Sequence, residues 1–244
     1  MAEEKTQAAV RDRLADLVLT SPDVEDFLRR LAEFAAADMS APSSEVFCGI
    51  TLVRHKKAAT VASSDERARA MDEVQYRVKD GPCLAALREA VTVHVPDLAN
   101  DGRWPEYAAA VASEKINAVL AVPFLAEGSS KAALNLYSEV TYGFTGESIR
   151  RAEEFALHAS TSLHLALRIA QLADARADLA AAMESRTVID LAAGVIMAEN
   201  RCSQHAAMTI LKNASSSRNI KLRDVAAAVL ASVSNEAVNF HFDA

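Results

Sequence analysis

The stretch from residue 147 to residue 193 contains neither proline nor glycine, and this feature most constrains what the chain can fold into. Proline interrupts helices because it lacks a backbone N–H, and glycine weakens them because its backbone has the most freedom to lose. Alanine and leucine, both strong helix formers, are frequent in this stretch. We therefore predict one long helix, for which Thr145 can serve as the N-terminal cap.

Six positions within this stretch alternate in steps of four and three residues, which is the spacing of a coiled-coil seam. They are Leu165, Ile169, Leu172, Arg176, Leu179 and Met183. One interpretation is that they pack on the chain's own sheet. We favour a homodimer in which two copies of the helix pair, because the run is longer than the face that one domain covers. Arg176 would then set the register at some cost in stability.

Composition narrows the class of protein. The chain has 244 residues, enough for one large domain or two ordinary ones, and a formal net charge of −7, which does not suit a protein that coats nucleic acid. Three widely spaced cysteines, a polar N-terminus and the lack of an 18-residue apolar run indicate a cytoplasmic protein without a membrane span. Because no known catalytic motif and no metal-ligand spacing occurs, we expect neither an enzyme nor a metal site.

The distribution of aromatic residues marks a change along the chain. Eleven of the thirteen Phe, Trp and Tyr residues lie at or before Phe155, and residues 156–239 contain none. Before this point, helical patterns and strand pairs follow each other irregularly, which predicts an α+β domain with a largely antiparallel sheet flanked by helices. Ser21 can cap the second helix. The expected helices cover 7–19, 23–38, 65–77, 83–89 and 104–116, and the expected strands cover 46–53, 58–62, 91–95, 118–124 and 132–137.

Side chains of this first domain suit either a ligand pocket or a packed core. The pocket candidates are Phe47, Cys83, His94, Trp104, Tyr107, Phe124 and Tyr137. An ordinary core is the simpler interpretation for most of them, whereas Trp104, in a loop, is less easily assigned to the core. The position of Cys83 at a helix N-terminus can lower its thiol pKa, although a small buried core residue is the simpler alternative. His94 has no companion ligand for a metal or haem.

The order of elements in this domain and several of its motifs resemble the GAF half of actinobacterial GAF–ANTAR regulators. The motifs begin at Asp80-Gly-Pro-Cys, continue from Val93 to Pro105, and end with the strands that close at Phe124 and Tyr137. The resemblance covers about residues 25–155. It implies a sensor domain that binds a small molecule or a partner, and it does not identify that ligand.

The last quarter of the chain predicts a small three-helix unit. The end of the long helix supplies its first helix, Ser203 can cap a second over 204–216, residues 215–219 form a loop, and a third covers 221–233. Between residues 186 and 223, six Lys and Arg residues face two acidic residues, so this region is locally basic on an acidic chain. Such a patch favours a selective anionic partner.

Residues of this unit are candidates for contact with RNA. Four of them, around the turn before the third helix, form either a solvated surface or a site for phosphates and base edges. These four are Arg218, Asn219, Lys221 and Arg223. Gly194 lies inside a helix, where glycine costs about 0.5–1 kcal/mol relative to alanine; with its neighbours it forms a smooth patch for a packed helix or for a nucleotide base. The candidates are Arg186, Ala192, Ala193, Gly194, Arg218, Asn219, Lys221 and Arg223.

The run from Arg186 to Met197, followed by Leu211, Asn219 and Lys221 at their spacing, resembles an ANTAR domain, the RNA-binding output module of transcription antitermination regulators. The resemblance implies that this unit binds hairpin loops in nascent RNA. The sequence departs from the family at Ala193, where many members carry lysine, and this removes one expected phosphate contact.

Together these features predict a GAF-like sensor over 7–155, a connecting helix over 156–183 and an all-α, three-helix ANTAR-like domain over 184–235. The predicted function is an antitermination regulator in which the sensor controls RNA binding. The alternative is a ligand or redox sensor that signals through protein contacts and binds no nucleic acid.

Overall fold

A five-stranded sheet forms the centre of the first part of the chain. The strands are β1 (Val46–Arg54), β2 (Lys57–Ser63), β3 (Val93–Val95), β4 (Ala118–Leu125) and β5 (Lys131–Ser138). Their order is β2-β1-β5-β4-β3, and every neighbouring pair is antiparallel. The structure, a computed structural model, describes residues 2–42, 44–54, 57–125 and 131–233. The chain divides between Ala170 and Gln171 into two compact units.

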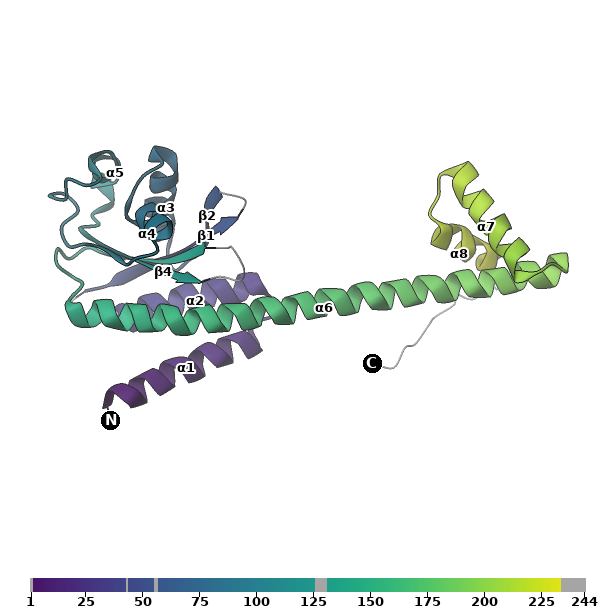
Figure 1. Ribbon diagram of the computed structural model, residues 1–244, viewed down its shortest axis with the longest axis horizontal. Coiled ribbons are helices and arrows are strands. Elements are labelled where there is room, and N and C mark those ends of the chain that lie inside the picture. Colours follow the sequence, from purple (N-terminus) through teal and green to yellow (C-terminus); the bar gives the residue numbers. More distant parts are fainter. Residues whose placement is uncertain (1, 43, 55–56, 126–130, 234–244) are drawn as a thin grey trace. The chain divides into compact units, whose positions relative to one another are not determined.

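Helices cover both faces of this sheet (Figure 1). Helices α1 (Ala2–Thr20), α2 (Val24–Met39) and the first part of α6 (Gly146–Asn200) lie on one face. Helices α3 (Glu66–Val78), α4 (Pro82–Glu89) and α5 (Pro105–Ala110) lie on the other, with a 3₁₀ turn, η1 (Ala112–Glu114), after α5. The predicted α+β class with a largely antiparallel sheet is confirmed.

Alternation along the strands assigns each side chain to one of the two layers. On β5, Leu134 and Leu136 face α2 and α6, whereas Asn135 and Tyr137 face α3 and α4. Strand β5 is buried along almost its whole length, because it lies in the middle of the sheet and is covered on both faces. The predicted pocket residues of the first unit are therefore divided between the two layers on either side of the sheet.

The local signals at the helix ends are partly as predicted. Thr145 Oγ1 accepts a hydrogen bond from the backbone N–H of Ser148 at 3.3 Å, which confirms it as the cap of α6. The cap of α2 is Asp23 and not the predicted Ser21, because the Asp23 carboxylate accepts from the N–H of Asp26. Helix α5 ends at Ala110, six residues earlier than predicted, since the chain tightens into η1 and then turns at Lys115, which has a positive φ of 57°.

The second unit contains the end of α6, helix α7 (Gln204–Arg218) and helix α8 (Leu222–Val233). Ser203 caps α7, as predicted, by accepting from the N–H of Ala206. Residues 215–218 belong to α7 and not to the predicted loop, and Asn219 ends the helix with a left-handed φ of 52°. The core of this unit consists of Val188, Ala192, Ala193, Ile196, Ala207, Leu211, Ala226 and Leu230.

Helix α6 runs without a break through both predicted domain boundaries, 155/156 and 183/184. Between residues 171 and 183, every side chain is exposed. Among the described residues, no helical segment combines the length and the hydropathy that a membrane span needs.

Candidate functional sites

Four of the seven predicted pocket residues meet on the α3–α5 side of the sheet. Phe47 of β1, Trp104, Tyr107 of α5 and Tyr137 of β5 belong to one buried cluster with Met71. All four aromatic side chains are at most 8% exposed. They therefore form a packed aromatic core, which was the simpler interpretation of the sequence for three of them, and Trp104, which was less easily assigned, also belongs to this core.

Two arginine side chains cover this cluster from outside. The guanidinium of Arg67 lies 4.5 Å from the centre of the Phe47 ring, and that of Arg103 lies 4.5 Å from the centre of the Trp104 ring. Arg103 also donates to the backbone carbonyl of His94 and to the carboxylate of Asp101. Cations over aromatic faces are stabilising, so both arginines close the edge of the cluster.

The other three predicted pocket residues do not join this cluster, so the prediction of one shared pocket is wrong. Phe124 packs in the α2 and α6 layer because its position on β4 faces the opposite side of the sheet. His94 faces that same side, where its ring lies edge-on to Phe144 at 6.4 Å. Burial lowers the pKa of His94, and the charge of Arg103 lowers it further.

Cys83 lies on the α4 side but packs with Leu87 and Ala133. Its thiol is fully buried and lies 3.4 Å from Thr51 Oγ1, to which it donates. Burial raises the pKa of this thiol to about 12, and the charge of Asp72 contributes to the shift. The lowered thiol pKa that a helix N-terminus can produce is therefore not found here, because loss of solvation outweighs it.

The most unusual group in the first unit is one that the sequence analysis did not single out, the fully buried carboxylate of Asp72 on α3. Its Oδ1 atom accepts hydrogen bonds from Asn135 Nδ2 at 2.7 Å and from the hydroxyl of Tyr137, both on β5. Its Oδ2 atom accepts from Thr60 Oγ1 of β2 at 3.0 Å. One carboxylate thus joins α3 to two strands of the sheet.

A row of hydroxyl groups continues from this carboxylate. Thr60 Oγ1 lies 2.9 Å from the hydroxyl of Tyr76, which lies 2.7 Å from Thr51 Oγ1. Asn135 Nδ2 also donates to Thr51 Oγ1 at 2.9 Å, and Asn135 Oδ1 is buried without a hydrogen-bond partner among the described residues. Burial raises the pKa of Asp72 to about 7, and hydrogen bonds from Tyr137, Thr60 and Asn135 partly offset that rise.

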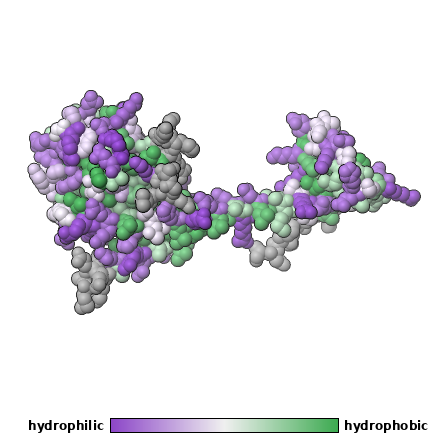
Figure 2. Space-filling model, in the orientation of Figure 1, coloured by the Kyte–Doolittle hydropathy of each residue, from purple (hydrophilic) through white to green (hydrophobic). Residues whose placement is uncertain are grey.

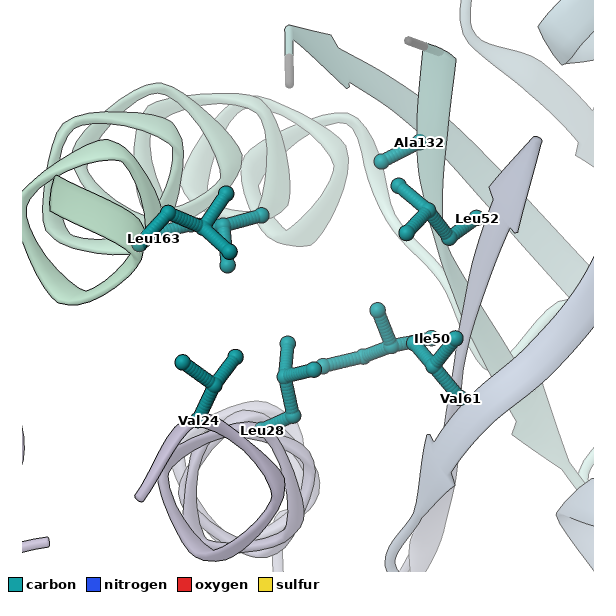
Figure 3. Close-up of a pocket in the computed structure, with 8 residues that line it drawn as sticks. Val24, Leu28, Ile50, Leu52, Val61, Ala132 and Leu163 are labelled. Carbon is teal, nitrogen blue, oxygen red and sulfur yellow. The ribbon is translucent and has the colours of Figure 1, made fainter. Parts of the chain in front are cut away.

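The opposite layer contains a small apolar cavity of about 20 Å³ (Figure 3). Side chains of α2, α6 and the sheet turn toward it, among them Val24, Leu52 and Leu163. It has room for roughly one water molecule, but such a site needs polar partners, and its lining is apolar. This cavity is therefore a packing defect and not a ligand site.

In the second unit, the turn between α7 and α8 carries exposed polar side chains. Arg218, Asn219 and Lys221 are all exposed. The N–H of Asn219 bonds to the carbonyls of Ser215 and Ser216, and the carbonyl of Lys221 accepts from the first turn of α8. The backbone of this turn is fixed by these bonds, while its side chains remain available to solvent.

Two other predicted RNA contacts lie in ion pairs. Arg223 on α8 lies 3.1 Å from Glu184 Oε1, and Arg186 lies 3.6 Å from Asp190 Oδ2, one turn along α6. All four side chains are at least 43% exposed, so these pairs contribute little to stability and can open to a competing anion.

Of the two interpretations of the smooth patch on α6, packing against a neighbouring helix applies to two of its three residues. Ala192 and Ala193 are buried in the core of the second unit, 0% and 2% exposed, because they face α7 and α8. Gly194 is exposed, and a Cβ atom built on it would meet nothing within 4 Å. Packing within this chain therefore does not explain the glycine.

The predicted seam along α6 is exposed. Leu165, Ile169, Leu172, Leu179 and Met183 keep between 44% and 69% of their surface in solvent, and Arg176 is exposed with them. Apolar side chains, coloured green, lie open along this helix in Figure 2. Packing on the chain's own sheet, the alternative interpretation of this spacing, does not cover these side chains.

The first unit is thus a central antiparallel sheet covered by helices, and the second is a helical unit with an exposed polar turn. Residues 21–164 match the GAF domain family, and residues 177–230 match the ANTAR domain family. The chain belongs to the GAF domain family and carries an ANTAR domain at its C-terminal side. Both are families of sensor and regulatory domains. No curated protein matches the sequence.

Solved structures share the fold of the first unit. The reduced form of fRMsr of Staphylococcus aureus is 14% identical with a TM-score of 0.50, over 64% of this chain and 94% of that one. The N-acylhomoserine lactone dependent LuxR family transcription factor CepR2 from Burkholderia cenocepacia is 15% identical with a TM-score of 0.51, over 69% and 99%. At these identities the likeness concerns the fold alone.

Proposed function

We propose that this protein is an RNA-binding transcription antitermination regulator whose GAF domain controls its ANTAR domain. The match of residues 177–230 to the ANTAR family carries the proposal. The exposed turn with Arg218, Asn219 and Lys221 supports it, because arginine and lysine bind phosphates and asparagine can pair with a base edge. The RNA partner is a hairpin loop in a nascent transcript.

The RNA-binding surface of this proposal is smaller than the sequence predicted. Ala192 and Ala193 are enclosed by α7 and α8, so the proposal leaves both out of the surface that meets a base. Gly194 remains open. Since residues 156–233 include no Phe, Trp or Tyr, recognition uses charge and hydrogen bonds rather than stacking on aromatic rings.

The exposed seam of α6 supports a homodimer. A single helix in water is only marginally stable, and one with an open apolar stripe needs a partner surface. A second copy in parallel fits, because heptad spacing is complementary to itself. Arg176 would then face its counterpart, with the neighbouring acids Asp174 and Asp178 able to balance the charge.

In this proposal the GAF domain acts through a shift between conformations. A signal that prefers one state of the domain changes the pairing of the two α6 helices, and this presents or hides two RNA-binding units. A small molecule bound by the GAF domain remains part of the proposal. The redox alternative is less well supported, because burial raises the pKa of both Cys48 and Cys83 and so disfavours the reactive thiolate.

RNA binding is tested by titrating the full chain with a hairpin RNA while the salt is raised from about 50 to about 200 mM. Lys221→Ala should weaken binding and reduce the salt slope by about one phosphate contact. Lys212→Ala is the matched control, since it removes the same charge from an exposed position of α7. An equal loss for both variants would indicate a general charge effect, and no binding at low salt would favour signalling through protein contacts.

Dimerisation is tested by sedimentation equilibrium. Leu172→Asp should give monomers, because it places an unpaired charge inside the seam. Ala173→Asp carries the same charge one position away, off the seam, and should remain dimeric. A full dimer for Leu172→Asp would exclude this stripe as the interface.

A further inference from the structure

The hydrogen bonds of Asp72 let one acidic group link α3 to both β2 and β5. We propose that this buried carboxyl group, which has only neutral hydrogen-bond partners, makes the GAF domain sensitive to protons, because the uptake of one proton reverses the row of hydrogen bonds that runs from Asp72 through Thr60 and Tyr76 to Thr51. The inference deepens the proposed function, because it names the proton as a signal to the sensor domain.

The surroundings of Asp72 favour a proton over a larger cation. Its direct hydrogen-bond donors, Asn135, Tyr137 and Thr60, are all neutral. No ion pair reaches the carboxylate among the described residues, and Arg69 acts on it only through its charge at a distance. The backbone at Gly49 is so close that an added Cβ would overlap Oδ2. A charged oxygen without a counterion in such close packing can be neutralised by a proton, which needs no room.

The other ionisable groups that face Asp72 do not compete for this proton. They are Tyr137 on β5, Cys83 on α4, Tyr107 on α5, and Tyr76 and Arg69 on α3 itself, while Cys48 on β1 lies in the opposite layer of the sheet. The described side chains of β2, residues 58–63, include no titratable group. Burial raises the pKa of each of these thiols and phenols. Within this cluster, Asp72 is therefore the group that titrates between weakly acidic and weakly basic pH.

Protonation changes the direction of the hydroxyl row. With Asp72 charged, Thr60 donates to Oδ2, so Thr60 accepts from Tyr76 and Tyr76 accepts from Thr51. When a proton from solvent binds Oδ2, the carboxyl group donates to Thr60, and each hydroxyl hydrogen along the row turns to the next oxygen. Thr51 Oγ1 then accepts from Tyr76 in place of one of its two present donors, Asn135 Nδ2 and Cys83 Sγ, because a hydroxyl oxygen has only two lone pairs. The new arrangement joins β2, α3, β1 and β5 differently.

The sign of the pH dependence follows from the raised pKa. An unfolded aspartate releases its proton near about pH 3.9, whereas folded Asp72 keeps it up to about pH 7. The stabilising contribution of this carboxyl group is thus complete below the unfolded pKa and is lost as the pH rises through the folded pKa. Between about pH 6 and about pH 8, the unfolding equilibrium constant of the GAF domain should rise about tenfold from this group alone.

The test uses urea unfolding of the full chain at several pH values, followed by the fluorescence of Trp104, the only tryptophan and a buried residue of this domain. Asp72→Asn imitates the protonated form and should remove the tenfold pH effect. Glu73→Gln makes the same charge change at the adjacent, exposed position and should keep it. If Asp72→Asn does not fold, ¹³C NMR of the wild-type carboxyl carbon gives the pKa of Asp72 directly.

A carboxyl pKa near 7 together with a pH effect that Asp72→Asn abolishes supports the inference. A carboxyl pKa below about 5, or equal pH effects in Asp72→Asn and wild type, overturns it. Neither measurement contains RNA, so each is independent of the RNA titration. If the protein fails to bind RNA while Asp72 titrates near pH 7 as proposed, only the proposed function is overturned.

Discussion

Gly49 on β1 offers a strong test of how tightly the Asp72 carboxylate is held. A Cβ atom at this position would overlap the carboxylate, which cannot move without leaving Asn135, Tyr137 and Thr60 as buried donors without an acceptor. Overpacking alone costs about 1–3 kcal/mol, and each lost bond to a charged group costs about 1.5–3 kcal/mol. We therefore expect Gly49→Ala to destabilise the GAF domain by at least about 3 kcal/mol, a large part of the stability of a typical domain.

The assay is urea unfolding followed by the fluorescence of Trp104. Gly102→Ala serves as the matched control, because a Cβ at position 102 meets nothing within 4 Å, and it should change stability by less than about 0.5 kcal/mol. Combining Gly49→Ala with Asp72→Ala should recover part of the loss, since the second change removes the overlapping atoms. A Gly49→Ala variant as stable as the Gly102→Ala control would refute the close packing described for Asp72.

Other properties of the structure give further expectations. Burial raises the pKa of the Cys83 thiol to about 12, so iodoacetamide at about pH 8 should label the part-exposed Cys202 of the native protein well before Cys83. Peptide mass spectrometry measures both labels, and equal labelling would contradict the burial of Cys83. Gly194→Ala should stabilise α6 by about 0.5–1 kcal/mol and slow the amide exchange of the residues near position 194. Faster exchange would contradict the open space around Gly194, because it would indicate a steric clash. Leu211→Ala should destabilise the ANTAR domain by about 2–5 kcal/mol, and amide exchange in that domain should become faster. The unfolding transition followed by Trp104 should stay unchanged, and a shift of that transition would show that the two units do not unfold separately.

The sequence predicts helices, strands and several helix caps because those signals are local. The spacing of apolar residues and the hydroxyls of Thr145 and Ser203 act within a few positions of themselves, and the structure has them where predicted. The end of α5 and the cap of α2 were predicted wrongly, because neighbouring residues compete for the same role. Asp23 lies two residues closer to the first turn of α2 than Ser21 does, and its carboxylate accepts from the N–H of Asp26.

The site residues were harder to predict, because their neighbours come from distant parts of the chain. Alternation along β4 places Phe124 away from Tyr107, although both are aromatic residues of one domain. A signal for Asp72 does exist: it falls at helical spacing with Ala68, Met71 and Gln75, so a charged residue lies on the apolar face of α3. Burial of Ala192 and Ala193 has the same origin, since only the packing of α7 and α8 decides which side of α6 is covered.

The unbroken course of α6 has a consequence for how this protein can change during evolution. Each residue of an α-helix turns the chain by about 100°, so one residue inserted between Ile169 and Leu179 would turn the apolar positions after it away from those before it. Seven added or removed residues restore the alignment to within about 20°. In the proposed dimer, the length of this helix is therefore restricted to steps of about seven residues, while its exposed residues outside the seam are free to vary.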